Sequence, residues 1–172
     1  MVKLTYKLKT NLFLINKKNE ASMTDRVILQ RYFSELQNGL HESIVKYATD
    51  RAKNHKCEVF ICVKNKSNCD QILERIFEKS VVKKLKSNND ITVNGQKLSL
   101  HSSKTIKKSY QPKAVYLLFF PGPDLLEAVE YQVGKSPVAE IIVFTEIDEH
   151  TEPTDAWMLE HDVRKLYTDT AI

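Results

Sequence analysis

Hydrophobic and polar residues alternate at the start of the chain. From Lys3 to Lys9 every second residue is apolar, which predicts a half-exposed strand. After a polar turn at 16–20, Ser22 and Asp25 have the spacing of a helix capping box. Apolar residues then recur at helical spacing, which predicts one long helix, or two collinear helices broken at Asn38–Gly39. These residues are Leu29, Phe33, Leu36, Leu40, Ile44 and Ala48.

The middle of the chain predicts a strand, a helix and a hairpin. Residues 58–63 are a short apolar run, and Ser67 and Asp70 begin a helix whose apolar stripe extends to Val81. Asn94–Gly95 is the strongest turn signal, because a type I′ turn needs a positive φ at two successive residues. The predicted hairpin pairs Val93 with Gln96, Thr92 with Lys97 and Ile91 with Leu98.

The last third alternates strands and helices. Residues 114–120 are apolar at every position, as in a central strand covered on both faces. Asp124 is predicted to cap a helix that ends at Gly134, and 138–145 is a second buried run. A last helix begins near Pro153 and carries Trp157. This order favours parallel strands joined by right-handed crossovers.

These elements predict an α/β fold in a single domain, residues 1–172. The expected architecture is a mixed β-sheet with a parallel β-α-β-α C-terminal half, a β-hairpin near Asn94–Gly95 and helices on both faces, which is a three-layer, Rossmann-like arrangement. The length of 172 residues and the hydrophobic share of 42% suit one such core.

Composition predicts a protein of the cytoplasm. The longest apolar run, 114–120, is far shorter than the roughly 20 residues that span a bilayer. The first twenty residues lack the continuous apolar stretch of a secretory signal. Cys57, Cys62 and Cys69 are an odd number of thiols, which favours a reducing compartment, and with His55 they lack the paired spacing of a zinc site.

Charge is divided unevenly along the chain. Residues 1–113 hold 23 Lys and Arg against 10 Asp and Glu, or +13, whereas residues 114–172 hold 3 against 12, or −9. Residues 79–113 alone contain nine lysines and one acid, and Tyr110 among them could stack on a base. The predicted polyanion-binding residues are Lys83, Lys84, Lys86, Lys97, Lys104, Lys107, Lys108, Tyr110 and Lys113.

A solvated surface explains the same lysines without binding. Lysine outnumbers arginine 21 to 5, as a composition bias alone would produce. Lysine holds phosphate as a point charge and lacks the planar fork that reads guanine, so any contact with nucleic acid would be sequence-nonspecific.

Several catalytic classes lack their motifs. The sequence has no glycine-rich nucleotide loop, no Gly-x-Ser-x-Gly elbow and no His-Glu-x-x-His helix. Two predicted strands end beside acidic residues, however, and Asp124, Glu146 and Asp148 could hold Mg²⁺ at one sheet edge against a phosphate. Helix capping and solvation explain the same carboxylates without a metal.

The function expected from these observations is a non-enzymatic binding module without a cofactor. Its Lys-rich segment, 79–113, would engage an acidic protein surface or nucleic acid, and its basic and acidic halves could pair in a homo-oligomer. The alternative is a Mg²⁺-dependent enzyme that acts on a phosphorylated small molecule or nucleic acid at the acidic sheet edge. A small-molecule sensor with a cleft at that edge is a third possibility.

Overall fold

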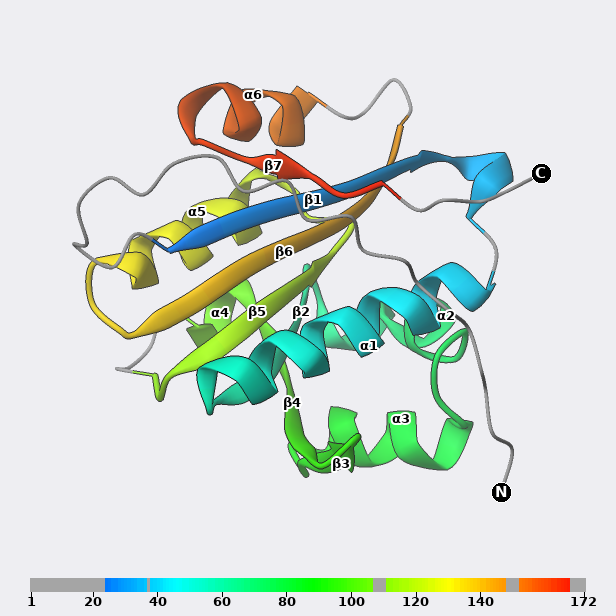
Figure 1. The fold of residues 1–172 in the computed structure, drawn as a ribbon. Helices are drawn as coiled ribbons and strands as arrows, with labels where there is room; N and C mark the ends of the chain where they lie inside the picture. The colour runs from blue at the N-terminus through cyan, green and yellow to red at the C-terminus, as the bar shows by residue number, and fades with distance from the viewer. Residues whose placement is uncertain (1–23, 37, 107–110, 148–151, 168–172) are drawn as a thin grey trace.

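A computed structural model describes residues 24–36, 38–106, 111–147 and 152–167. The strand predicted over Lys3–Lys9 lies outside these residues. Within them the chain forms one seven-stranded sheet in the order β3-β4-β2-β5-β6-β1-β7 (Figure 1). Every neighbouring pair is parallel except β3 and β4, which are antiparallel. The strands are β1 (Asp25–Tyr32), β2 (Glu58–Val63), β3 (Ile91–Val93), β4 (Gln96–Ser102), β5 (Ala114–Phe119), β6 (Val138–Ile147) and β7 (Arg164–Lys165).

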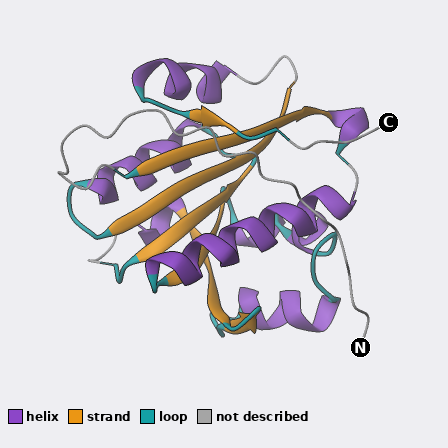
Figure 2. Cartoon of the chain, in the orientation of Figure 1, coloured by secondary structure: helices purple, strands orange, loops and turns teal. Residues whose placement is uncertain are grey.

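Helices cover both faces of this sheet, as the sequence predicted (Figure 2). On one face lie α1 (Asn38–His55), α2 (Asp70–Leu73) and α3 (Lys79–Lys86). On the other lie α4 (Ser103–Ile106), α5 (Pro123–Val133) and α6 (Glu152–Glu160). Two 3₁₀ turns, η1 (Phe33–Glu35) and η2 (Lys66–Asn68), complete the described elements. The three-layer α/β architecture is therefore confirmed.

The direction of each crossover explains which face its helices cover. The connections from β1 to β2 and from β2 to β4 run toward the β3 edge, and they carry α1, α2 and α3. The connections that follow β4, β5 and β6 run toward the β7 edge and carry α4, α5 and α6. Crossovers of one hand that run in opposite directions must use opposite faces. The chain therefore leaves neighbouring strands β2 and β5 in opposite directions, which creates a topological switch point between them.

Two predictions from local sequence are confirmed in detail. All residues of β5 are buried, and β5 is the central strand of the sheet. The hairpin has the predicted register, with Val93 opposite Gln96 and Ile91 opposite Leu98. Asn94 and Gly95 have φ values of 51° and 76°, which is the positive pair that the turn required.

The helix predicted to begin at Ser22 and Asp25 is wrong, because residues 25–32 form strand β1. Val27, Ile28 and Leu29 are all buried, since β1 lies inside the sheet between β6 and β7 with helices on both faces. A strand that is covered on both faces shows no alternation of apolar and polar residues. The apolar run of β1 therefore continues the helical spacing of the apolar residues in α1, and the two together resemble one helix. The helix itself begins at Asn38, where a break was expected.

Two further predictions need correction. The single helix expected from Ser67 to Val81 is two shorter helices, α2 and α3, joined by a turn. Asp124 does not cap α5, because Gly122 is the capping residue and Pro123 occupies the first turn. The last helix does carry Trp157, which is buried against the sheet. Among the described helices none is long and apolar enough to cross a membrane.

Candidate functional site

The lysines of the predicted binding segment surround one edge of the sheet. Helix α3 lies on one face, the β3–β4 hairpin forms the edge, and α4 lies on the other face. We call this part of the molecule, residues 79–106, the basic edge; it holds six lysines and one aspartate, a net charge of +5. The described residues from 114 onward hold three basic and nine acidic side chains, a net charge of −6.

Two of the predicted binding lysines already have carboxylate partners. Lys86 Nζ lies 2.6 Å from Asp70 Oδ2, and this contact raises the pKa of the lysine. Lys97 Nζ lies 3.0 Å from Asp90 and 3.3 Å from Glu58, so two carboxylates share one ammonium group. These pairs cancel much of the local charge, and they leave the other lysines as the source of the positive field.

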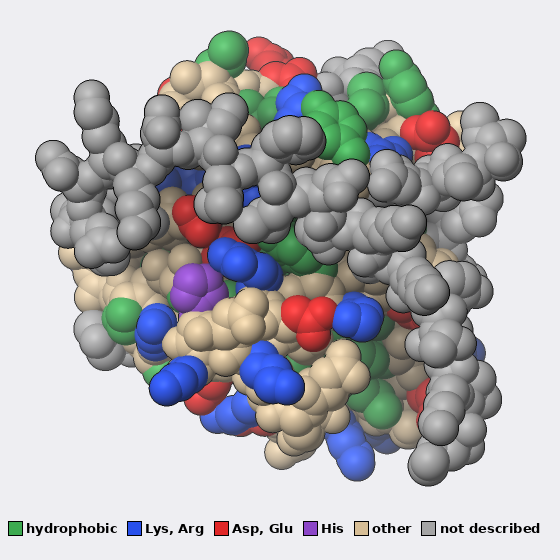
Figure 3. All heavy atoms as spheres, in the orientation of Figure 1, with side chains coloured by type: hydrophobic (Ala, Val, Ile, Leu, Met, Phe, Trp, Pro, Cys, Tyr) green, Lys and Arg blue, Asp and Glu red, His purple; other side chains and the backbone are tan. Residues whose placement is uncertain are grey.

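Four ammonium groups of the basic edge have no partner among the described residues. They belong to Lys79, Lys83 and Lys84 of α3 and to Lys104 of α4, and all four side chains are exposed. In α3 the side chains of Val82 and Leu85 are buried against the sheet. The intervening Lys83 and Lys84 therefore point outward into solvent. On the face shown in Figure 3, most of the visible basic side chains lie over the part of the molecule where Figure 1 places α1, and fewer lie over α3.

The remaining predicted binding residues are separate from α3. Lys104 lies across the sheet from it on α4, so no flat surface can contact both helices at once. Lys113 is exposed just before the amino end of β5. Lys107, Lys108 and Tyr110 lie outside the described residues. The structure therefore brings together the lysines of α3, and it does not bring all nine predicted residues onto one face.

A cavity of about 300 Å³ lies beside the basic edge, and sequence reasoning missed it. Its lining includes Phe60, Lys66, Lys97, Ser99 and His101. His101 Nε2 lies 2.9 Å from Ser99 Oγ, and the imidazole packs on Phe60 with ring centroids 4.2 Å apart. Burial, with the charge of Lys66, lowers the pKa of His101 to about 4, so the imidazole is neutral near pH 7 and adds no positive charge to the basic edge.

The acidic residues proposed as magnesium ligands are only partly described. Asp124 is exposed in the first turn of α5, and Glu146 is half-buried on β6, opposite Arg31 in the β1–β6 register. Asp148 lies outside the described residues. Within the described part of the chain, no group of three potential metal ligands is present. The magnesium hypothesis stays a prediction.

A buried carboxylate on β6 is a second feature that the sequence did not reveal. The Glu140 side chain is 0% exposed, and it receives a hydrogen bond of 3.2 Å from the Tyr47 hydroxyl and a salt bridge from Arg51. His55 Nε2 lies 3.7 Å from the same carboxylate. Tyr47, Arg51 and His55 are spaced four residues apart on α1, so one stripe of this helix converges on Glu140. This spacing of four is the sequence signal by which the three side chains could be recognised as one stripe. Their contacts with Glu140 attach α1 to β6, which is a structural role.

No protein family model, curated protein or solved structure matches this chain. Charges and cavities of the described residues are therefore the observations that bear on its function.

Proposed function

We propose that the chain is a non-enzymatic binding module that engages an acidic partner, nucleic acid or protein, through the exposed lysines of α3. The observation that carries this proposal is the contrast between paired and unpaired lysines at the basic edge. Lys86 and Lys97 are held by carboxylates, whereas Lys79, Lys83 and Lys84 lie on one exposed helix with no partner among the described residues. Unpaired cations on one helix are free to contact a row of phosphates or carboxylates.

The chemistry of the contact predicts a weak and nonspecific interaction. Each lysine ammonium meets phosphate as a point charge, and α3 presents no arginine that could read a base edge. Three lysines that each neutralise one phosphate predict a slope of about −2.7 in log K against log salt for double-stranded DNA. The affinity should therefore fall steeply with salt and depend little on base sequence.

Fluorescence polarisation with labelled single- and double-stranded oligonucleotides tests this proposal. The titration is repeated from low to physiological salt for the wild type and for Lys83→Ala/Lys84→Ala. This variant should bind more weakly and reduce the salt slope by about 1 for each lysine removed. The control is Lys135→Ala/Lys165→Ala, which removes the same charge from the acidic part of the chain and should leave the slope unchanged.

Three outcomes are informative. If both double variants weaken binding equally, net charge rather than α3 controls the interaction, and the proposal is wrong. If no oligonucleotide binds even at low salt, the nucleic-acid version is rejected. The protein version then predicts that an acidic polypeptide such as poly-glutamate binds the wild type and binds the α3 variant more weakly; no binding there would reject the module altogether.

Charge separation within the chain favours a second candidate partner, which is another copy of the protein. The basic edge and the acidic C-terminal part lie toward opposite edges of one sheet, with net charges of +5 and −6 among the described residues. Complementary regions of this kind can dock head to tail. Light scattering should then show association that increases with concentration and disappears at high salt. A monomer at every concentration and salt level would exclude this candidate.

A further inference from the structure

A second cavity, of about 290 Å³, lies at the carboxyl ends of β2 and β5. Its lining includes Lys64 and Asn65 just after β2, Asn68 of η2, and Phe119 and Phe120 at the end of β5. This cavity is separate from the basic edge, and none of the residues of α3 lines it. We call it the switch-point cavity.

The position of this cavity follows from the topology of the sheet. The chain leaves β2 toward the β3 edge and leaves neighbouring β5 toward the β7 edge, so no connection crosses the gap between their carboxyl ends. In open α/β sheets this crevice is the place where ligands bind, because the diverging loops leave space above the strands. The cavity thus coincides with the position that general fold geometry assigns to a ligand.

The backbone at the end of β5 is strained in a way that places an aromatic ring at the cavity. Phe120 has a φ of 46°, which is unfavourable for a residue with a Cβ. Its amide still donates to Phe144 O at 2.8 Å, so the ladder between β5 and β6 continues through the strained residue. Glycine would fit this conformation without strain. The Phe120 ring packs partly on the core, with its centroid 5.6 Å from that of Phe144, and the same half-buried side chain lines the cavity.

The polar part of the lining offers donors and no carboxylate. The Lys64 ammonium is exposed and has no partner among the described residues. Asn65 Oδ1 accepts hydrogen bonds from the Ser67 amide at 3.0 Å and from the Ser67 hydroxyl at 2.8 Å, which leaves the Asn65 Nδ2 as a donor. Asn68 adds a second side-chain amide. One cation and two amide donors, with no acidic residue in the lining, favour an anionic group.

From this geometry we propose that the switch-point cavity binds a small aromatic anion. Its ring would pack against the half-buried Phe120, and its phosphate or carboxylate would lie near Lys64, Asn65 and Asn68. A volume of about 290 Å³ is at the lower limit of ligand cavities, so the ligand is no larger than a mononucleotide. This site is independent of α3 and goes beyond the binding of a macromolecule.

Amide chemical-shift titrations of the 172-residue chain test the inference. The probes are adenosine monophosphate and indole-3-acetate, which carry a ring and an anion, together with adenosine and inorganic phosphate, which carry one feature each. The two aromatic anions distinguish a phosphate from a carboxylate ligand. At least one of them should shift the amides of Lys64, Asn65, Asn68 and Phe120, and it should bind about tenfold more tightly than either single-feature probe.

Variants separate this site from the basic edge. Lys64→Ala should weaken the aromatic anion about tenfold, and Asn68→Ala should weaken it by a smaller factor. Phe120→Gly relieves the strain but also removes the contact with Phe144, so this variant should lose anion binding and its fold is checked by the dispersion of its amide shifts. Lys83→Ala/Lys84→Ala should bind the anion as the wild type does, whatever the result for oligonucleotides.

Two results would overturn the inference. The first is that neither aromatic anion shifts these amides, or that adenosine binds as tightly as its monophosphate while indole-3-acetate does not bind. The second is unchanged affinity in both Lys64→Ala and Asn68→Ala. Lys64 and Asn68 are both exposed, so replacing either by alanine should leave the protein folded. A loss of binding in these variants can then be assigned to the missing side chain.

Discussion

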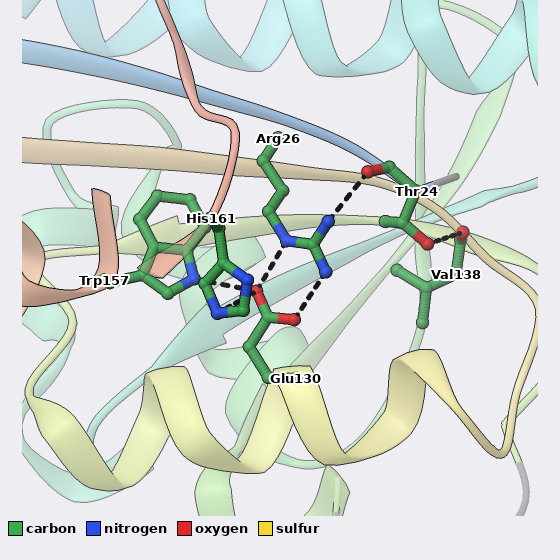
Figure 4. A network of polar contacts seen from close by, with 6 residues as sticks. All are labelled: Thr24, Arg26, Glu130, Val138, Trp157 and His161. Carbon is green, nitrogen blue, oxygen red and sulfur yellow. Dashed lines mark hydrogen bonds and ion pairs between the residues drawn. The ribbon is translucent and has the colours of Figure 1, made fainter. Parts of the chain in front are cut away.

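Arg26 of β1 and Glu130 of α5 form a two-point ion pair, with Nε 2.8 Å from Oε1 and Nη2 2.7 Å from Oε2 (Figure 4). The same carboxylate accepts a hydrogen bond of 2.7 Å from the Trp157 indole of α6. His161 Nε2 lies 3.7 Å away. One glutamate therefore joins a strand from the beginning of the described chain to two helices of its C-terminal half.

Replacing Glu130 by glutamine should destabilise the protein by about 2–4 kcal/mol, because a mostly buried Arg26 guanidinium would lose its charge partner. Urea unfolding followed by tryptophan fluorescence measures this loss, since Trp157 is the chain's one tryptophan. Lys46→Ala, which breaks an exposed ion pair with Asp50, is the control and should change stability by less than about 1 kcal/mol. Equal effects of the two substitutions would contradict this prediction.

The same pair makes stability depend on pH. Burial would raise the pKa of Glu130, but hydrogen bonds from Arg26 and Trp157 and the charge of Arg26 hold this pKa below its ordinary value of 4.5. A lowered carboxyl pKa stabilises the folded state above its unfolded pKa, and the stabilisation is lost as pH falls through the folded value. The stability difference between wild type and Glu130→Gln should therefore shrink as pH falls below about 4.5. A difference that stays constant in acid would refute this linkage.

Arg51→Met should cost about 3–5 kcal/mol, because it leaves the fully buried Glu140 carboxylate without its cation. A second variant, Arg51→Met/Glu140→Leu, replaces both charges with apolar side chains and should recover most of this loss. Chemical denaturation of the two variants and of Glu140→Leu alone completes a double-mutant cycle. Additive losses in that cycle would mean that the two side chains do not stabilise each other.

Gly95→Ala should destabilise the hairpin by about 1–2 kcal/mol, because Gly95 has a φ of 76°. No atom lies within 4 Å of the position that a Cβ would occupy, so backbone conformation is the sole cost. Gly134→Ala is a matched control with equally open space and a φ of −85°, and it should be neutral or stabilise the protein by up to about 1 kcal/mol. If the two variants lose the same stability, the turn is not the cause.

The three thiols should react in sequence with an aromatic disulfide reagent. Cys57 is half-buried, whereas Cys62 and Cys69 are buried, and burial raises the pKa of all three thiols. Because the thiolate is the reactive form, the folded protein should show one slow reaction, at Cys57, and three rapid reactions once it is unfolded. Cys57→Ser should remove the native reaction. A native reaction that persists in this variant would assign it to another cysteine.

Local signals allowed several elements to be predicted from sequence. The hairpin register depends on Asn94 and Gly95, which are adjacent, and β5 is recognisable because a central strand is apolar on both faces. The sequence predicts a helix where strand β1 lies, because the partner strand β6 is remote in sequence. Nothing near Val27–Leu29 indicates the cover that makes this run a strand, and Leu40 and Ile44 continue a helical spacing beyond it.

The binding residues were predictable as a charge excess but not as an arrangement. Counting charges identified the basic segment, whereas the partners of its lysines depend on the fold: Lys86 pairs with Asp70, 16 positions away, and Lys97 with Glu58, 39 positions away. The switch-point cavity requires the strand order, because β2 and β5 are neighbours only when the β3–β4 hairpin lies on the other side of β2. Side chains that are brought together by the order of the strands in the sheet produce no periodic pattern in the sequence.

Insertion of β1 between β6 and β7 has a consequence for biosynthesis. Thr24 and Val138, which are hydrogen bonded beside the β1–β6 pair, are separated by 114 positions, so the ribosome releases β1 long before either neighbouring strand exists. Strands β2, β4 and β5 can assemble during this interval, while both hydrogen-bonding edges of β1 stay open. Nascent chains that stall before β6 should consequently be the form most in need of a chaperone.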